Sequence, residues 1–536
     1  MQGRKHYSEK LFTHFQLSDR VPSYNFYRRL KAALDLGWLY GRTKKYYGRD
    51  GQKSIDPVVF FKLLLIGYFE NLLSDRRIID TASMRLDMLY FLGYDMDEEL
   101  PWHSTISRTR QLYGEELFHE LFTTVLKQCI DAGMVGGRRQ AIDSAPVKVN
   151  ASMDSLKEKE ILADGGVYLD SLQQEEEKEP TDKKDNADDK DQHSVSASRN
   201  KAVQHHHDWK TKAYKGMPGG GKQNKLPDSE QNASDEKEYL PKFVSNHTHY
   251  STTDSDARVS VKPGKPRQLN YAAQVSVDTA SHVITAIEAH HADKKDSQCL
   301  PSILDRAVTN LKAGGLHLEE ALCDAGFSSG EALKALEEKG IVGYIPNFGQ
   351  YKPHREGFRF NPFRNAYVCG RGVELPFKKI TTTSLGYQMK QYRSSSKDCR
   401  NCPLRGTCIG KSDFKKIDDS VDKPYYDRMH RRLQSEKAKV MKKVRQSTVE
   451  PVLGTLINFG GMRRVNTRGI AGATKCMLMA AVAYNLKKLL KHTAPKVQAG
   501  VVGLKSGSEG MKKAVLRLFA AGIRYRASYS KSLLCG

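Results

Sequence analysis

The stretch GRRQAIDSAPVKVNAS, residues 137–152, decides the fold because it predicts the first strand of a sheet. Its short apolar run ends on one carboxylate, Asp143, and small, polar and proline residues follow. We predict that Asp143 lies at the end of this strand, where its side chain can face a cleft. A partly buried carboxylate needs an ionic partner or a metal ion to compensate its charge. An acid at this position is therefore a candidate site residue, although a turn or cap role is the simpler explanation for it alone.

The rest of the chain is strongly basic. Its 536 residues include 86 Lys and Arg against 62 Asp and Glu, which gives a net charge of +24. This excess suits a polyanionic partner, most simply nucleic acid, with an anionic membrane surface as the less favoured alternative. The longest apolar run, residues 58–69, is interrupted by Lys62 and is too short to cross a bilayer. The first ten residues lack the apolar stretch of a signal peptide. We expect an intracellular protein, cytoplasmic and associated with the nucleoid, without a membrane partner.

Residues 24–135 show apolar residues at three- and four-residue spacing, which predicts helices. Asp56 followed by Pro57 is typical of a helix N-terminus. The segment PWHSTISRTR, with Arg108 and Arg110, could open a helix that recognises DNA. A solvated helical face explains these arginines equally well, so both interpretations stay open.

The chain changes character twice after this region. Residues 154–245 are charged, polar and Gly-rich, which predicts a disordered insertion, and His205–His207 within it are most simply a chance polar run. From residue 256 to 347 the pattern predicts a hairpin, a helix, a strand, a helix and a strand. Together with the first strand this is a mixed α/β sheet.

A second acid, Asp324, ends the predicted strand EALCD. Two acids from separate strands of one sheet can converge, and a third acid from a packed helix would complete a cluster of oxygen ligands. Such clusters hold Mg²⁺ or Mn²⁺, and two ions can support phosphoryl transfer. Either aspartate alone is more simply a turn or helix-cap residue.

The cysteines form a separate constellation. The segment CRNCPLRGTC contains Cys399, Cys402 and Cys408, and Cys369 is available as a fourth ligand. Four thiolates at such spacing suit a structural zinc site in a reducing compartment. Plain thiols or a redox pair are the alternatives.

A long basic helix is predicted from about residue 424 to 448, followed by a basic stretch around FGGMRRVNTRG. These segments could contact DNA phosphates close to the acids, and a solvated face is the alternative. The candidate DNA-contacting residues here are Arg428, Arg431, Arg432, Lys443, Arg445, Arg463 and Arg464.

In combination these segments resemble the DDE transposases of bacterial insertion sequences, in the branch with an N-terminal helical domain and a Cys-rich insertion. The resemblance covers nearly the whole chain except residues 154–245 and the tail. It rests on the segments FFKLLLIGYFENLLSDRRIIDTA, WHSTISRTR, AIDSAPVKVNAS, DARVSVKPGKPRQLNYAAQVSVD, LCDAGFSSG, YRSSSKDCRNCPLRGTC, VRQSTVEPVLGTLINFGGMRRVNTRGI and AVAYNLKKLL.

The resemblance implies an α/β fold with a ribonuclease-H-like mixed-sheet catalytic core, an N-terminal all-helical DNA-binding domain and a small zinc-binding insertion. It places Asp143 on the first strand, Asp324 after the fourth, and the third acid at Glu450, which together would hold two Mg²⁺ or Mn²⁺ ions. It also implies a homodimer on double-stranded DNA. The expected parts are 1–135 (N-terminal domain), 136–153 and 246–348 (first part of the core), 154–245 (insertion), 349–423 (Cys-rich insertion), 424–495 (last part of the core, with Glu450) and 496–536 (basic tail).

Glu450 departs from a simple helical pattern because Pro451 follows it. A residue before proline is disfavoured in helical geometry, so Glu450 is expected either at a kink or at the start of a new helix. Many relatives carry a lysine seven residues after this glutamate, where this chain has Ile457. Asp278 is the main rival acid, and the sequence DTAS around it is typical of a hairpin turn.

The functional expectation is a transposase that cleaves the ends of an insertion sequence and joins them to target DNA by two-metal phosphoryl transfer. Two alternatives remain. One is a transposase-derived DNA-binding protein without catalysis, and the other is a metal-dependent nuclease that cuts without joining.

Overall fold

The computed structural model describes most of the chain, namely residues 16–48, 54–159, 245–246, 248–260, 267–347, 349, 351–383 and 386–493. The predicted tail, 496–536, and nearly all of the predicted insertion, including His205–His207, lie outside these residues. The two ends of the insertion meet, because β2 (Leu156–Glu158) pairs antiparallel with β3 (His249–Ser251).

The N-terminal region is helical, as predicted. Its longest apolar helix starts where the sequence places it, since Asp56 accepts hydrogen bonds from the backbone N–H groups of Val58 and Val59 and Pro57 occupies the first turn. The helical elements in chain order are α1 (Leu17–Arg20), α2 (Phe26–Ala33), α3 (Leu39–Thr43), the 3₁₀ turn η1 (Lys44–Tyr46), α4 (Pro57–Phe69), α5 (Asp75–Ser83), α6 (Leu86–Leu92), α7 (His103–Leu112) and α8 (Glu115–Asp131).

The centre of the molecule is a mixed sheet in which β1 is flanked by β5 and β7, and β8 follows β7 at the edge. On the other side, β5 also pairs with β4 and β6. Strands β4 to β6 run antiparallel to their partners, whereas β7 and β8 are parallel. The predicted order of hairpin, helix, strand, helix and strand is confirmed. The bounds are β1 (Arg139–Lys148), β4 (Arg258–Ser260), β5 (Gln268–Asp278), β6 (Ile284–His291), α11 (Asp296–Ala313), β7 (Glu320–Leu322), η3 (Ala325–Phe327), α12 (Gly330–Glu338) and β8 (Val342–Tyr344).

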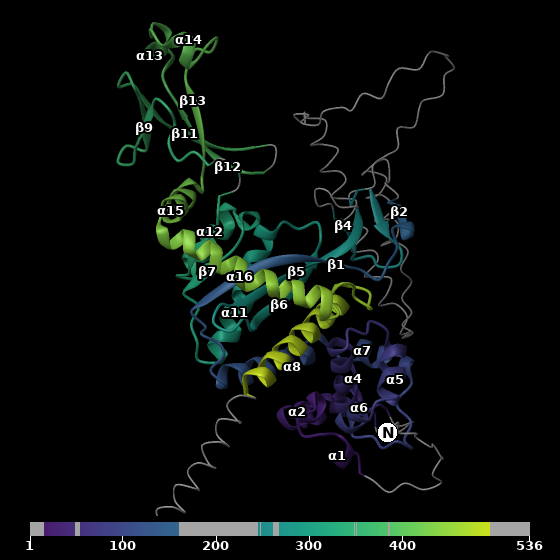
Figure 1. Ribbon diagram of the computed structural model, residues 1–536. Coiled ribbons are helices and arrows are strands. Elements are labelled where there is room, and N and C mark those ends of the chain that lie inside the picture. Colours follow the sequence, from purple (N-terminus) through teal and green to yellow (C-terminus); the bar gives the residue numbers. More distant parts are fainter. Residues whose placement is uncertain are drawn as a thin grey trace, which may run out of the picture.

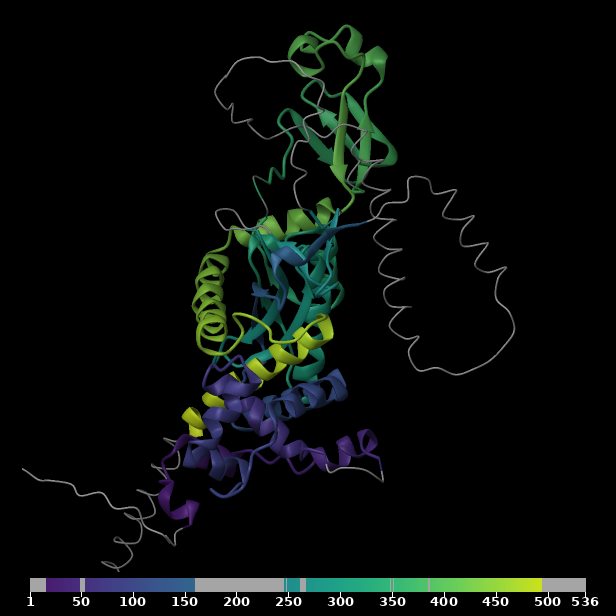
Figure 2. The same ribbon diagram turned by 90° about the vertical axis from the view of Figure 1, so that its right-hand side faces the viewer.

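The Cys-rich insertion forms a sheet of its own with strand order β13-β12-β11-β10-β9. Its small core consists of Tyr367, Leu375, Tyr392 and Ile417. It projects from one end of the central sheet, while the N-terminal helices lie at the opposite end (Figures 1 and 2). Its elements are β9 (Phe358–Asn361), β10 (Ala366–Cys369), β11 (Glu374–Thr382), β12 (Gln388–Arg393), α13 (Ser396–Arg400), α14 (Arg405–Cys408) and β13 (Lys416–Ser420).

The prediction of one continuous basic helix from residue 424 to 448 is wrong. The structure has two helices, α15 (Lys423–Leu433) and α16 (Glu436–Phe459). Ser435 is the reason for the break, because it is extended and its hydroxyl accepts the backbone N–H of Ala438 as an N-cap. The cap allows α16 to start in a new direction, across the face of the central sheet (Figure 1).

A further helix spans residues 470–493 and packs against the N-terminal helices. One continuous hydrophobic core contains residues of α2 to α8, of β1 and β5, of α16 and of this 470–493 helix. Buried Lys475 ties it to α7, donating to the backbone oxygens of Arg110 and Tyr113 at 3.1 and 2.6 Å. The N-terminal helices are therefore packed onto the last helix of the central region.

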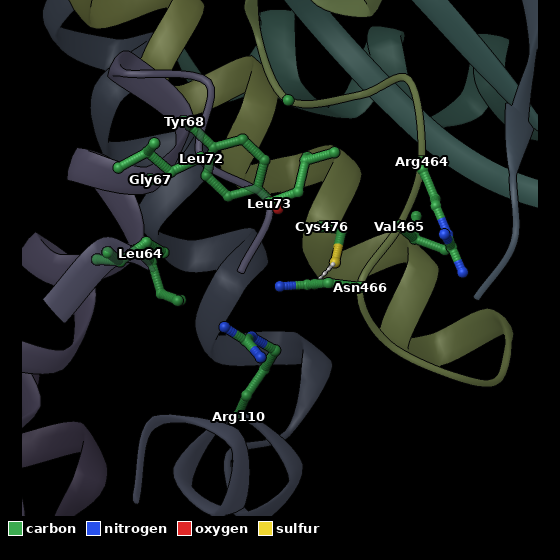
Figure 3. Close-up of a pocket in the computed structure, with 12 residues that line it drawn as sticks. Leu64, Gly67, Tyr68, Leu72, Leu73, Arg110, Arg464, Val465, Asn466 and Cys476 are labelled. Atoms are coloured by element: carbon green, nitrogen blue, oxygen red, sulfur yellow. Dashed lines mark hydrogen bonds between the residues drawn. The ribbon is translucent and has the colours of Figure 1, made fainter. Parts of the chain in front are cut away.

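A small pocket marks this junction (Figure 3). Tyr68 and Leu72 lie on the side of the N-terminal helices, and Asn466 and Cys476 lie on the other, joined by a 3.3 Å hydrogen bond. None of the predicted acids lines it. In the part of the chain that the structure describes, no helix is both long and apolar enough to span a membrane.

Candidate active site

Asp143 lies in the middle of β1, not at its end as predicted, because the strand continues through Pro146 to Lys148. It lies on the same face of the strand as the buried residues Ala141 and Ala145, since side chains alternate along a strand. That face is covered by α16, so the acid points at the helix rather than into open solvent, and its side chain is only 17% exposed.

Asp324 reaches the same level of the sheet from the neighbouring strand. Ala141 pairs with Leu322 in the parallel register of β1 and β7, so Asp143 and Asp324 each lie two residues beyond a paired position. Asp324 follows β7, as predicted, and its carboxylate caps the turn η3 by accepting the backbone N–H of Gly326 at 2.9 Å. The two strands thus bring Asp143 and Asp324 to the same level of the sheet, a region called the acidic edge below.

Glu450 comes from α16. Of the two predicted settings, the start of a new helix is wrong, because α16 runs without interruption from Glu436 to Phe459 with Pro451 inside it. The Glu450 side chain is 56% exposed and lies 3.7 Å from Arg445, measured from Oε1 to Nη2. The same guanidinium donates to Asp143 Oδ2 at 2.8 Å. Arg445 therefore connects the first and third predicted acids.

The electrostatics of this edge fit a cluster of interacting acids. Burial raises the pKa of the Asp143 carboxyl, and the negative charge of Asp324 raises it further. The backbone N–H of Ser144 and the Arg445 guanidinium act in the opposite direction, and the net pKa is above the ordinary value. Asp143 and Asp324 are thus close enough to repel each other, and a cation between them would stabilise both charges.

One acid at this edge was missed by sequence reasoning. Asp296, the first residue of α11, lies across Gly326 from Asp324: a Cβ on Gly326 would meet Asp324 Oδ1 at 3.1 Å and Asp296 Oδ2 at 3.3 Å. Gln274 on β5 donates to Asp296 at 2.9 Å. The only sequence signal for Asp296 was its position at the start of a helix, which is common for an acid with no site role.

The rival acid Asp278 has a structural role, as its turn sequence predicted. It is buried and accepts hydrogen bonds from the backbone N–H groups of Gly136, Gly137 and Ala280 and from Gln140. Ile457, at the position of the lysine in many relatives, packs against the hydrophobic core. Its side chain has no charge to offer a phosphate.

The four insertion cysteines are half-buried free thiols. Three of these cysteines lie near Lys415. The backbone N–H of Lys415 donates to the Ser394 hydroxyl, and that hydroxyl lies 3.0 Å from the Cys399 sulfur. The Lys415 ammonium donates to the backbone oxygen of Cys408. The same ammonium lies over Phe358, which pairs with Cys369. Across the described residues, no three His, Cys, Asp or Glu side chains are gathered tightly enough to hold a metal ion, either here or at the acids.

The predicted DNA-contacting residues divide by exposure. Arg110 is only 6% exposed and pairs with Asp75 through two hydrogen bonds of 2.7 and 3.0 Å, so its guanidinium is not available to DNA in this structure. Arg428 pairs with Glu337 in the same two-bond manner, and Arg432 donates to the backbone oxygen of Gly343. The exposed members of the set are Arg108, Arg431, Lys443, Arg463 and Arg464.

Comparison with known families gives two matches. Residues 15–112 match a transposase domain (DUF772), and residues 368–490 match a transposase DDE domain. The second match contains Glu450, whereas Asp143 and Asp324 precede it. Comparisons with curated proteins and with solved structures gave no match. Both matches describe transposase domains and lie in the order that the resemblance implies, so they are consistent with a DDE transposase of an insertion sequence.

Proposed function

We propose that this transposase cleaves the ends of its insertion sequence and joins them to target DNA by phosphoryl transfer at Asp143, Asp324 and Glu450. The observation that carries the proposal is that Arg445 pairs with both Asp143 and Glu450, while the charge of Asp324 acts on Asp143. The strand order β6-β5-β1-β7-β8, with β7 and β8 parallel to β1, supports a ribonuclease-H-like core.

DDE transposases generally use divalent metal ions, and the residues at this edge suit them. All three predicted ligands are carboxylates, the donors that Mg²⁺ and Mn²⁺ prefer. Gly326 leaves the space between two carboxylates free, and the buried side-chain oxygen of Gln274 beside them has no hydrogen-bond partner among the described residues. When bound, two ions supply activation of the attacking oxygen and stabilisation of the leaving oxygen.

The chain's own groups orient the reaction. Arg445 pairs with both Asp143 and Glu450, so one positive charge offsets part of the negative charge of the two carboxylates. Lys443 on α16 and Arg431 on α15 are exposed, and in this proposal they bind the DNA backbone. These contacts fix the strands and lower the entropic cost of alignment. A homodimer that holds two DNA ends remains part of the proposal.

The insertion is proposed to carry a structural zinc ion on Cys369, Cys399, Cys402 and Cys408. Support comes from the contacts of Lys415, which bring three of these cysteines to one end of the insertion sheet. A zinc ion would stabilise a module whose own hydrophobic core is small. The test is metal analysis of the purified protein. We expect one zinc ion per chain in the wild type and none in Cys402→Ser. Wild-type protein that contains no zinc, or that keeps its melting temperature when the zinc is removed, contradicts the proposal.

The test of the function uses purified protein, labelled duplex from the ends of the element, Mg²⁺ and a target plasmid. Strand-transfer products support the proposal. Cuts without joining indicate a nuclease, and shifted but intact DNA indicates a DNA-binding protein without catalysis. Either of these two outcomes refutes strand transfer.

A further inference from the structure

Gly326 lies beside two carboxylates, those of Asp324 and Asp296. A Cβ at this position would lie 3.1 Å from Asp324 Oδ1 and 3.3 Å from Asp296 Oδ2, tighter than ordinary van der Waals contact. The backbone of Gly326 does not adopt a positive φ, so glycine is not required there for conformation. What the missing side chain provides is open space between the two acids.

Gln274 supplies an independent sign of a ligand at the same place. Its side chain is fully buried, and its amide nitrogen donates to Asp296 Oδ1 at 2.9 Å. Because that bond places the amide group beside Asp296, its oxygen lies there too, and this oxygen has no hydrogen-bond partner among the described residues. A buried acceptor without a donor destabilises the fold unless a cation or a donor meets it.

The position of Asp296 in the first turn of α11 has a simpler explanation as a favourable charge at a helix N-terminus. That explanation does not account for the unpartnered oxygen of Gln274, nor for a glycine between Asp296 and Asp324. A divalent cation accounts for all three, since it prefers carboxylate and amide oxygens and would reduce the repulsion between the acids.

We propose that Asp296 and the side-chain oxygen of Gln274 join Asp324 as ligands of one divalent cation. This rests on the proposed function, in that the cation is one of those proposed for the acidic edge. The added carboxylate and amide make the Asp324 side the more completely liganded one. Here Asp296 serves as a metal ligand and Gly326 as the space that the ion requires.

The test measures Mn²⁺ binding to the full chain without DNA, from the loss of the free-ion signal in electron paramagnetic resonance. Asp296→Asn keeps the shape of the side chain and removes its charge. Gly326→Ala fills the space between the acids and leaves both carboxylates in place. Asp305→Asn is the matched control, because Asp305 lies on the same helix and pairs with Lys339 away from this edge.

Both Asp296→Asn and Gly326→Ala are expected to weaken Mn²⁺ binding by about tenfold or more, the loss that mutation of a supporting group in a metal site typically causes. Asp305→Asn is expected to bind Mn²⁺ as the wild type does. Circular dichroism establishes that each variant is folded, and if one variant does not fold, the other decides. Unchanged Mn²⁺ affinity in a folded variant overturns the proposal. Wild-type protein that binds Mn²⁺ in this Asp296-dependent way but never cuts DNA refutes the proposed function and supports the metal site.

Discussion

At the scale of single residues, Arg445 supplies positive charge to two of the acids at the acidic edge. It contacts Asp143 at 2.8 Å and lies 3.7 Å from Glu450, so two acids from distant parts of the chain share one positive charge. Its side chain is 13% exposed, which strengthens these interactions relative to a surface pair. Sequence reasoning placed Arg445 among the DNA-contacting residues, whereas the structure gives its guanidinium to the acids.

Asp143→Asn is expected to abolish DNA cleavage while DNA binding is retained. Asparagine keeps an acceptor for Arg445 and the shape of the side chain but removes the charge that a metal ion needs, so the free energy of unfolding should change by only about 1 kcal/mol. Gel-shift and cleavage assays on one preparation separate the two properties. Loss of binding together with unfolding would instead mean that Asp143 is structural.

Glu288 is expected to make the free energy of unfolding depend on pH. It is buried, which by itself raises the pKa of its carboxyl, but hydrogen bonds from His290, Arg306 and Ser302 lower it to a net value of about 2. A depressed acid stabilises the fold above its unfolded pKa and loses that contribution as pH falls toward the folded one. Glu288→Gln should therefore be less stable than wild type at pH 7 by up to about 3 kcal/mol.

The measurement is urea unfolding of wild type and Glu288→Gln between pH 7 and pH 3. The difference in unfolding free energy should shrink as pH falls below about 4.5, the ordinary value for a glutamate. A difference that stays constant over this range would show that the Glu288 charge contributes nothing and that only packing is lost.

At the scale of elements, the 470–493 helix holds the N-terminal helices through α7. Lys475 is 8% exposed, and its ammonium meets two backbone oxygens at the C-terminal end of α7, where helices carry unpaired acceptors and partial negative charge. Burial lowers the pKa of this lysine, which shows the desolvation that these bonds must offset. Residues 461–476 thereby join α16, with Glu450, to the helices at the other end of the molecule.

Lys475→Met should lower the free energy of unfolding by about 1–3 kcal/mol, because two buried backbone oxygens lose their donor. Lys488→Met is the control on the same helix, since Lys488 donates to one backbone oxygen, that of Ser281 in the β5–β6 turn. Its effect should be the smaller of the two. If thermal unfolding shows the same loss of stability in both variants, the contact of Lys475 with α7 contributes no more than an ordinary lysine–backbone hydrogen bond.

At the scale of the whole molecule, the chain combines a net charge of +24 with a group of acids in its central sheet. Several arginines pair with acids inside the fold, so the net charge does not say which of the basic side chains are available to DNA. On α15, Arg428 is neutralised by Glu337, whereas Arg431 is exposed. The two residues lie on one helix and differ in pairing, which makes them a matched pair.

Arg431→Ala should reduce the slope of log affinity against log salt concentration by about 1, the value for one phosphate contact, and Arg428→Ala should leave it nearly unchanged. The measurement is fluorescence anisotropy with a labelled duplex over a range of salt concentrations. The same slope change in both variants would refute the distinction between paired and exposed arginines.

The sequence by itself determined the elements whose signals are local. Helical periodicity predicted the N-terminal helices, alternation predicted the hairpin β5–β6, and turn chemistry assigned Asp278 to a structural role. The order of strands and motifs also led to Asp143, Asp324 and Glu450, whose place in a catalytic site stays a prediction. These features follow from neighbours in the chain, which a sequence pattern contains.

Only the tertiary structure decided which charges meet. Arg108 and Arg110 stand two residues apart in one motif, yet one is exposed and the other is buried against Asp75. Arg445 faces Asp143 across 302 residues, and Asp296 faces Asp324 across a glycine. Burial and pairing depend on residues far away in the chain, and the desolvation of a charge is a property of the packed site rather than of its local sequence.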